Sequence, residues 1–164
     1  PGLITLSDIN AEMLRVGKDR LLNKGVTGPI EYVEADAEAL PFADNSYDRV
    51  IMGFGLRNVT DKQQALHEIY RVLKPGGLLL VLEFSTAKLP LLKEIYEFYS
   101  FNVIPKVGQL ITQDKDSYQF LVESIRMHPD QDTLQTMFEQ AQFTDCQYHN
   151  LTGGIVAIHK GYKY

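Results

Sequence analysis

The feature that most constrains this chain is an alternation of short apolar runs, typical of β-strands, with longer amphipathic runs, typical of helices. The strand-like runs occupy residues 3–7, 30–35, 49–54 and 78–84. Such alternation predicts an α/β fold whose mostly parallel sheet is covered by helices. The run Arg49–Phe54 is apolar almost throughout, which predicts a strand buried on both faces.

Capping residues predict where two helices lie between these strands. Asn10 is expected to cap a helix over 10–23. Thr60 and Gln63 have the spacing of a capping box, and Leu66, Ile69, Tyr70 and Leu73 then fall on one helical face. The run Lys74–Gly77 is expected to end this second helix, immediately before the apolar strand 78–84.

The carboxy-terminal part follows a different pattern. Two further helices are expected over 116–127 and 132–142. Residues 143–149 and 155–160 alternate like two antiparallel strands around Thr152–Gly154. The predicted sheet is therefore mostly parallel and ends in an antiparallel hairpin.

Composition excludes several classes of protein. A length of 164 residues fits one domain, and a net charge of −5 does not suit a nucleic-acid-binding surface. The single cysteine, Cys146, allows no internal disulfide and fits a reducing compartment. The four histidines have no metal-site spacing, so no metal is predicted.

Acidic residues end the first two predicted strands, where ligands bind in sheets of this kind. Asp8 is suited to accept hydrogen bonds from a ribose diol, or else to cap the following helix. Asp36 and the amide of Ala37 are suited to the edge of an adenine ring, with Leu40 and Phe42 as an apolar lid, unless Asp36 is a solvated loop residue. Two such acids in consecutive units favour one shared nucleoside.

The third strand runs into Gly53–Asn58, which only partly matches a glycine-rich phosphate loop. A glycine at position 53 would let a ligand approach the backbone closely. Arg57 and Asn58 lie at the end of a buried strand, where an unpaired guanidinium is costly. They either pair with structural partners or face a ligand. Glu83, inside an apolar strand, either bonds locally or takes part in catalysis.

Five motifs distributed along the chain resemble those of the ubiquinone/menaquinone biosynthesis C-methyltransferases. They are FGLRNVTDK at 54–62, YRVLKPGG at 70–77, LEFS at 82–85, ESIRMHPDQ at 123–131 and GYK at 161–163. The resemblance covers essentially the whole chain. It implies a Rossmann-like class I methyltransferase fold that uses S-adenosyl-L-methionine to methylate a polyprenyl benzoquinol or demethylmenaquinol ring carbon.

The resemblance also implies roles for the candidate residues. Asp8 would hold the ribose hydroxyls, Asp36 and Ala37 would contact the adenine, and Gly53, where the family often has serine, would line the cofactor site with its backbone. Arg57 and Asn58 would lie beside the methyl donor and the quinol ring, as the catalytic pair.

The family's first strand and its glycine-rich loop have no counterpart in residues 1–164. In the family's sheet that strand lies between the strands that here end at Asp8 and near Gly53. The chain is thus expected to be the carboxy-terminal two-thirds of an enzyme, a single truncated domain, with weak or no cofactor binding alone. The alternatives are another methyl acceptor, a nicotinamide-dependent oxidoreductase, and an inactive scaffold module of a quinone-synthesis complex.

Residues 88–113 form an aromatic segment where class I methyltransferases insert substrate-binding elements. The segment includes Tyr96, Phe98, Tyr99 and Phe101. It is expected to line a channel for the polyprenyl tail or touch a membrane, unless it is a helix packed on the core. The expected location is the cytoplasm, peripheral on the inner membrane, or the mitochondrial matrix. A homodimer or a quinone-biosynthesis complex is the expected assembly, without nucleic acid.

Overall fold

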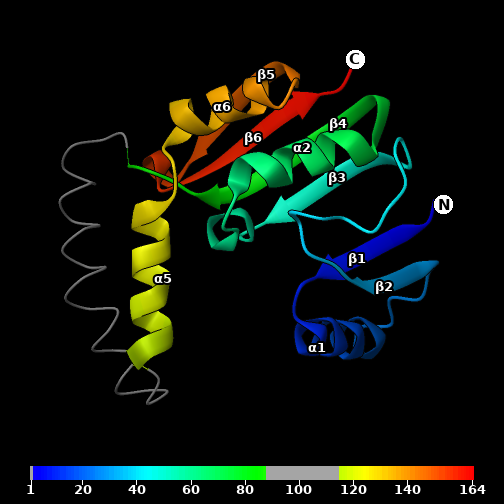
Figure 1. The fold of residues 1–164 in the computed structure, drawn as a ribbon. Coiled ribbons are helices and arrows are strands. Elements are labelled where there is room, and N and C mark those ends of the chain that lie inside the picture. The colour runs from blue at the N-terminus through cyan, green and yellow to red at the C-terminus, as the bar shows by residue number, and fades with distance from the viewer. Residues whose placement is uncertain (1, 88–114) are drawn as a thin grey trace.

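The computed structural model describes residues 2–87 and 115–164, which form two sheets and their helices (Figure 1). A two-stranded sheet pairs β1 (Ile4–Asp8) with β2 (Ile30–Glu34). A four-stranded sheet has the order β3-β4-β6-β5. Its strands are β3 (Tyr47–Gly53), β4 (Leu73–Phe84), β5 (Thr144–Leu151) and β6 (Val156–Tyr162). The predicted α/β class with a terminal hairpin is confirmed.

The first strand, helix and strand form a parallel β-α-β unit. Helix α1 (Ala11–Asn23) begins where predicted, because the side chain of Asn10 accepts hydrogen bonds from the amides of Glu12 and Met13. β1 and β2 run parallel, and Asp8 pairs in register with Glu34. The carboxyl ends of both strands therefore lie side by side.

The second unit places α2 (Lys62–Val72) between the parallel strands β3 and β4. Its N-cap is Asp61, whose carboxylate accepts from the amide of Gln64, so the predicted Thr60 capping box is wrong. The amides of Thr60 and Asp61 instead donate to Glu38, a residue from the loop after β2. This long-range acceptor replaces the local pattern.

Strand β4 begins at Leu73, so it includes the run Lys74–Gly77, which was expected to separate the helix from the strand 78–84. The pairing of β3 with β4 shifts register between Tyr47 and Arg49, opposite these extra residues, and Gly76 has a φ of 82°. Burial of β3 on both faces is also wrong, because Ile51 is 73% exposed. Among the described strands, β3 has β4 as its only neighbour, so one edge is open.

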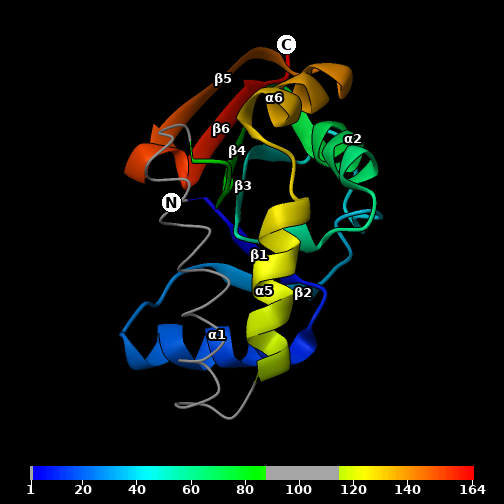
Figure 2. The ribbon, with the colours of Figure 1, turned by 90° about the vertical axis from the view of Figure 1, so that its left-hand side faces the viewer.

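The carboxy-terminal part adds α5 (Lys115–Met127) and α6 (Gln131–Gln140), then the hairpin β5–β6, whose connection contains the short 3-10 helix η2 (Thr152–Gly154). β6 pairs antiparallel with both β4 and β5, as predicted. Helices α2 and α6 lie together on one face of this sheet (Figures 1 and 2). The core between them contains Leu56, Ala65, Leu66, Ile69, Leu73, Leu79, Val81, Leu134, Phe138, Ala141 and Phe143.

Candidate functional site

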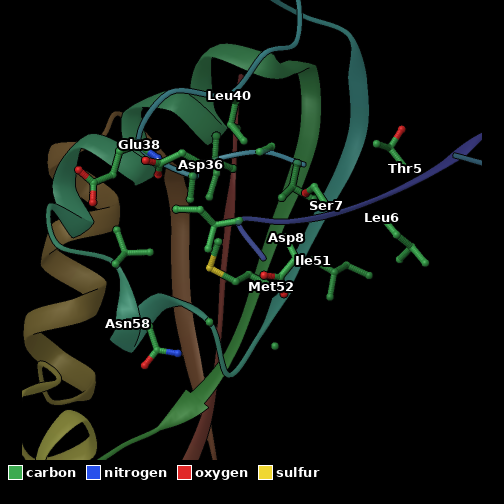
Figure 3. A pocket seen from close by; sticks show the side chains of 18 of the residues that line it. Thr5, Leu6, Ser7, Asp8, Asp36, Glu38, Leu40, Ile51, Met52 and Asn58 are labelled. Carbon is green, nitrogen blue, oxygen red and sulfur yellow. The ribbon is translucent and has the colours of Figure 1, made fainter. Parts of the chain in front are cut away.

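A cleft of about 800 Å³ opens at the carboxyl ends of β1, β2 and β3 and continues between β1 and β3. Its volume is in the range of small-molecule sites. Asp8 and Gly53 end β1 and β3, Asp36 and Ala37 follow β2, and Arg57 and Asn58 lie in the short 3-10 helix η1 (Leu56–Asn58) after β3. All six site residues predicted from the sequence line this one cleft. Figure 3 shows Asp8, Asp36 and Asn58 around it.

Asp8 is the last residue of β1, and its side chain is oriented by the backbone beyond it. Its Oδ1 accepts from the amide of Asn10 at 2.9 Å, while Asn10 is the actual cap of α1. Oδ2 accepts no hydrogen bond from the residues that the structure describes. The helix-capping interpretation of Asp8 is therefore wrong, and one carboxylate oxygen remains available at the cleft.

Asp36 follows β2, whose end is tied to β1 by a hydrogen bond from the amide of Ala35 to the carbonyl of Asp8 at 3.0 Å. The Oδ1 atom of Asp36 accepts from the amide of Glu38 at 2.9 Å, which fixes the turn. Within the described residues its Oδ2 has no partner. The two acids therefore come from adjacent strand ends, and each has one oxygen free for hydroxyl or amino groups.

Apolar groups complete this side of the cleft. Leu40 and Phe42 come from the loop after β2, and Met52 comes from β3. A Cβ built on Gly53 would meet no atom within 4 Å, so side-chain packing does not require glycine there. Carboxylates beside an apolar wall suit a nucleoside, which has polar hydroxyls and a flat, weakly polar base.

Arg57 forms a buried ion pair with Glu83, the structural pairing that the sequence left open. The distance from Nη1 to Oε1 is 3.1 Å, and the two side chains are 12% and 1% exposed. Oε1 also accepts from the amide of Phe84, and Oε2 accepts from the amide of Arg57. Glu83 is thus saturated with donors and does not line the cleft. It positions Arg57 and is poorly placed to act as a base.

The Arg57 guanidinium also donates through Nη1 to the carbonyl of Phe54 and lies 5.5 Å from the ring of Phe84. Its Nη2 makes no hydrogen bond with the residues that the structure describes, which leaves a cationic donor for the cleft. Asn58 is exposed beside it. Phe54 has a φ of 55°, a left-handed conformation that a bulky side chain rarely adopts.

His128 is a buried polar side chain whose ring forms no hydrogen bond with the described residues. Both ring nitrogens are buried without a partner, and burial, the main cause, lowers the pKa to about 4. Coulombic repulsion from Lys62, His159 and Arg57 acts in the same direction. His128 does not line the cleft and is interpreted as a neutral packing residue. No cluster of metal-ligating side chains occurs among residues 2–87 and 115–164.

Three residues that fix the loop after β2 were missed in the sequence. Glu38 and Glu68 accept backbone amides, and Arg71 donates to backbone carbonyls. The local signal was the spacing of Glu68 and Arg71, which places opposite charges one helical turn apart. For Glu83, the local bonding that the sequence analysis gave as one alternative is what the structure shows. The aromatic residues Tyr96, Phe98, Tyr99 and Phe101 lie outside the described residues. No helix of the described part is both long and apolar enough to cross a membrane.

Comparison with known proteins finds one family along nearly the whole chain. The model of the ubiE/COQ5 methyltransferase family matches residues 1–163. Over 163 residues, or 99% of the chain, it is 60% identical to the protein named ubiquinone/menaquinone biosynthesis C-methyltransferase UbiE from Legionella pneumophila strain Paris. The chain spans only 65% of that relative's length.

Solved structures show a shared fold at low sequence identity. A SAM-dependent methyltransferase from Thermotoga maritima, described as a possible histamine N-methyltransferase, has a TM-score of 0.68 at 19% identity, covering 98% of this chain and 73% of its own. The Haemonchus contortus phosphoethanolamine N-methyltransferase 2 in complex with S-adenosyl-L-methionine has a TM-score of 0.67 at 15% identity, with coverage of 97% and 43%. The Rossmann-like methyltransferase fold is confirmed.

Proposed function

Because the chain belongs to the ubiE/COQ5 methyltransferase family, we propose that it forms most of an S-adenosyl-L-methionine-dependent C-methyltransferase. The substrate class is a polyprenyl benzoquinol or demethylmenaquinol, the ring methylated in ubiquinone or menaquinone biosynthesis. The observation that carries the proposal is the convergence of two strand-end carboxylates and a buried arginine on one cleft.

In this proposal the described residues bind the adenosine half of the cofactor. The free oxygen of Asp8 accepts from the ribose hydroxyls, while Asp36 and the Ala37 amide read the adenine edge. Gly53 allows the cofactor to approach the strand backbone, since nothing fills the space above its Cα. When bound, S-adenosyl-L-methionine supplies an electrophilic methyl group on a sulfonium.

Arg57 and Asn58 act on the acceptor. A quinol becomes nucleophilic at a ring carbon as a ring hydroxyl loses its proton. Arg57 stabilises the developing phenolate through Nη2, which donates to none of the residues that the structure describes. Asn58 orients the ring by hydrogen bonding. The ring carbon would then form a bond to the methyl carbon as the bond from sulfur to methyl breaks, with S-adenosylhomocysteine as the leaving group. The ring carbon would lose its proton to solvent or to a base, and the ring hydroxyl would regain the proton that it lost.

A further parallel strand completes the domain between β1 and β3. The facing edges of both strands are unpaired among the described residues, and Ile51 is exposed beside the gap. Unpaired edges with apolar side chains are a liability in a finished sheet. The full-length enzyme, meaning this chain joined to the segment that its relatives possess in addition, would supply that strand and the loop for the methionine end of the cofactor.

In this proposal the aromatic segment 88–113 lines a channel for the polyprenyl tail. The enzyme contacts the membrane peripherally from the cytoplasmic side. On α5, the apolar side chains of Phe120 and Met127 are seven residues apart and both exposed. Assembly as a homodimer or within a quinone-biosynthesis complex belongs to the same proposal, since exposed apolar side chains suit burial against a partner.

Three measurements test the function. Full-length enzyme is incubated with reduced quinone and S-adenosyl-L-methionine, and mass spectrometry is expected to find the ring-methylated quinol. Arg57→Ala is expected to lower turnover by about 10²–10³, as loss of a donor to a developing oxyanion does. A fall of less than about threefold with unchanged binding would remove Arg57 from the chemistry. A thermal-shift titration of the 164-residue chain is expected to show at most weak cofactor binding.

A further inference from the structure

The loop of residues 36–45, called here the 36–45 loop, forms one wall of the cleft. Ala37, Glu38, Leu40 and Phe42 all line it. Between the isolated bridge of Asp36 with Ala39 and the start of β3, the loop has no regular secondary structure. Its conformation must therefore be set by contacts with other parts of the chain.

Two charged residues in the last turns of α2 supply those contacts. Arg71 donates through Nη2 to the carbonyl of Leu40 at 2.9 Å and through Nη1 to the carbonyl of Phe42 at 2.8 Å. Glu68 Oε2 accepts from the amide of Leu40 at 2.9 Å. Both polar backbone groups of Leu40 are thus held by the same helix.

Glu68 and Arg71 also hold each other. Nε and Nη2 of Arg71 donate to the two carboxylate oxygens of Glu68 at 2.9 and 2.8 Å, a bidentate pair. Nη1 additionally donates to Asp44 at 2.7 Å. The guanidinium therefore uses all three nitrogens, and its orientation is fixed by partners on the helix and on the loop together.

The other end of the 36–45 loop is fixed at the opposite end of α2. Oε1 of Glu38 accepts from the amides of Thr60 and Asp61 at 2.9 and 3.0 Å, and its carbonyl accepts from Gln64. Contacts at the start and at the end of α2 thus both hold the loop. Leu40 and Phe42 are held at the end of the helix, where Arg71 lies. Neither Glu68 nor Arg71 lines the cleft.

We propose that Glu68 and Arg71 are positioning residues that set the cofactor affinity of this protein by holding Leu40 and Phe42 as a preformed apolar wall for the adenine ring. The inference rests on the proposed function, which assigns the adenine to this wall. If the wall is already ordered before binding, the free energy of binding does not include the cost of ordering it. Loss of the Glu68–Arg71 pair should therefore weaken cofactor binding without altering the methyl-transfer step.

The test compares Arg71→Met with Lys74→Met in the full-length enzyme. Lys74 is the matched control, since it follows the same helix and carries the same charge, but its Nζ donates to Asp48 and to no residue of the 36–45 loop. Arg71→Met is expected to raise the Kd for S-adenosylhomocysteine, measured by calorimetry, and the KM for S-adenosyl-L-methionine by about 10–100-fold. The kcat at saturation should stay within about threefold.

Amide hydrogen exchange gives a readout that does not depend on ligand. The Leu40 amide should exchange at least about tenfold faster in Arg71→Met than in Lys74→Met, because its acceptor, Glu68, loses its own support. If Arg71→Met does not fold, Glu68→Gln replaces it. An amide oxygen can still accept from Leu40, so a smaller rise of about 3–10-fold in Kd is expected.

An unchanged Kd in Arg71→Met, or the same change in Lys74→Met, would overturn the inference. A fall in kcat without a change in Kd would do so as well, since it would place Arg71 in the chemistry instead. Failure of the wild-type enzyme to bind S-adenosylhomocysteine would count against the proposed function. The hydrogen-exchange rate of the Leu40 amide would still test whether the Glu68–Arg71 pair orders the 36–45 loop.

Discussion

Replacing either member of the Arg57–Glu83 pair should destabilise the protein far more than breaking a surface ion pair. Glu83 is 1% exposed and Arg57 12%, so a charge left alone there stays largely out of water. Removing one partner of a buried pair costs about 3–5 kcal/mol, against about 0–1 kcal/mol for an exposed one. At about 2–4 °C per kcal/mol for a chain of this size, Glu83→Gln or Arg57→Met should lower Tm by roughly 6–20 °C.

A double-mutant cycle separates the pair from the other hydrogen bonds of Glu83. In the variant with both Arg57→Met and Glu83→Gln, both charges are gone, yet the amide oxygen of Gln can still accept from a backbone N–H that Glu83 binds now. Much of the stability lost in either single variant should therefore return, giving a coupling free energy of at least about 2 kcal/mol.

Urea unfolding followed by circular dichroism measures all four proteins. The surface pair of Lys74 and Asp48, with side chains that are 42% and 80% exposed, provides a control cycle whose coupling should stay below about 1 kcal/mol. If the Arg57–Glu83 coupling is no larger than that of the control, the pair does not fix the guanidinium. Arg57 would then have to be positioned by a ligand.

Three further outcomes concern stability. His128, with its pKa lowered to about 4 by burial, takes up a proton only on unfolding between pH 6.5 and 4; unfolding free energy should fall by about 1.4 kcal/mol per pH unit of acidification, and His128→Phe should remove that slope in urea titrations. Gly161→Ala should cost about 1–3 kcal/mol, because its Cβ would lie 2.9 Å from the Cβ of Phe143, while Gly53→Ala, with no atom within 4 Å, should stay within about 1 kcal/mol in the same assay. Phe54 has a φ of 55°, so Phe54→Gly should be about 1 kcal/mol more stable than Phe54→Ala by thermal unfolding, the reverse of the usual order.

The sequence predicted the elements whose signals are local. Asn10 caps α1, and the hairpin β5–β6 forms around Thr152–Gly154, because neighbouring residues determine a cap and a turn. The Thr60 capping box failed because Glu38, 22 residues earlier, takes the amide that the box would use. The two-sided burial of β3 failed for a related reason, since hydropathy records how apolar Ile51 is and cannot record whether a strand covers it.

In the candidate site, too, local features could be predicted and contacts between distant residues could not. The residues at strand ends could be predicted, because a parallel sheet brings its carboxyl ends to one edge whatever the loops do. The choice between a ligand-facing and a paired Arg57 could not, because Glu83 is 26 residues away and meets it only across the β3–β4 pairing. The role of Arg71 could not be predicted either, since its partners Leu40 and Phe42 are about 30 residues earlier.

The two carboxylate–guanidinium pairs have the same physical role, since each holds a backbone segment that lines the cleft. Glu68 with Arg71 holds backbone atoms of the 36–45 loop, and Glu83 with Arg57 holds the turn after β3 through the Arg57 amide and the Phe54 carbonyl. The charges of Arg57 and Glu83 balance each other, whereas Arg71 pairs with both Glu68 and Asp44, which leaves one net negative charge in that group. Under the proposed function, Nη2 of Arg57 donates to the methyl acceptor while Glu83 keeps the guanidinium in place.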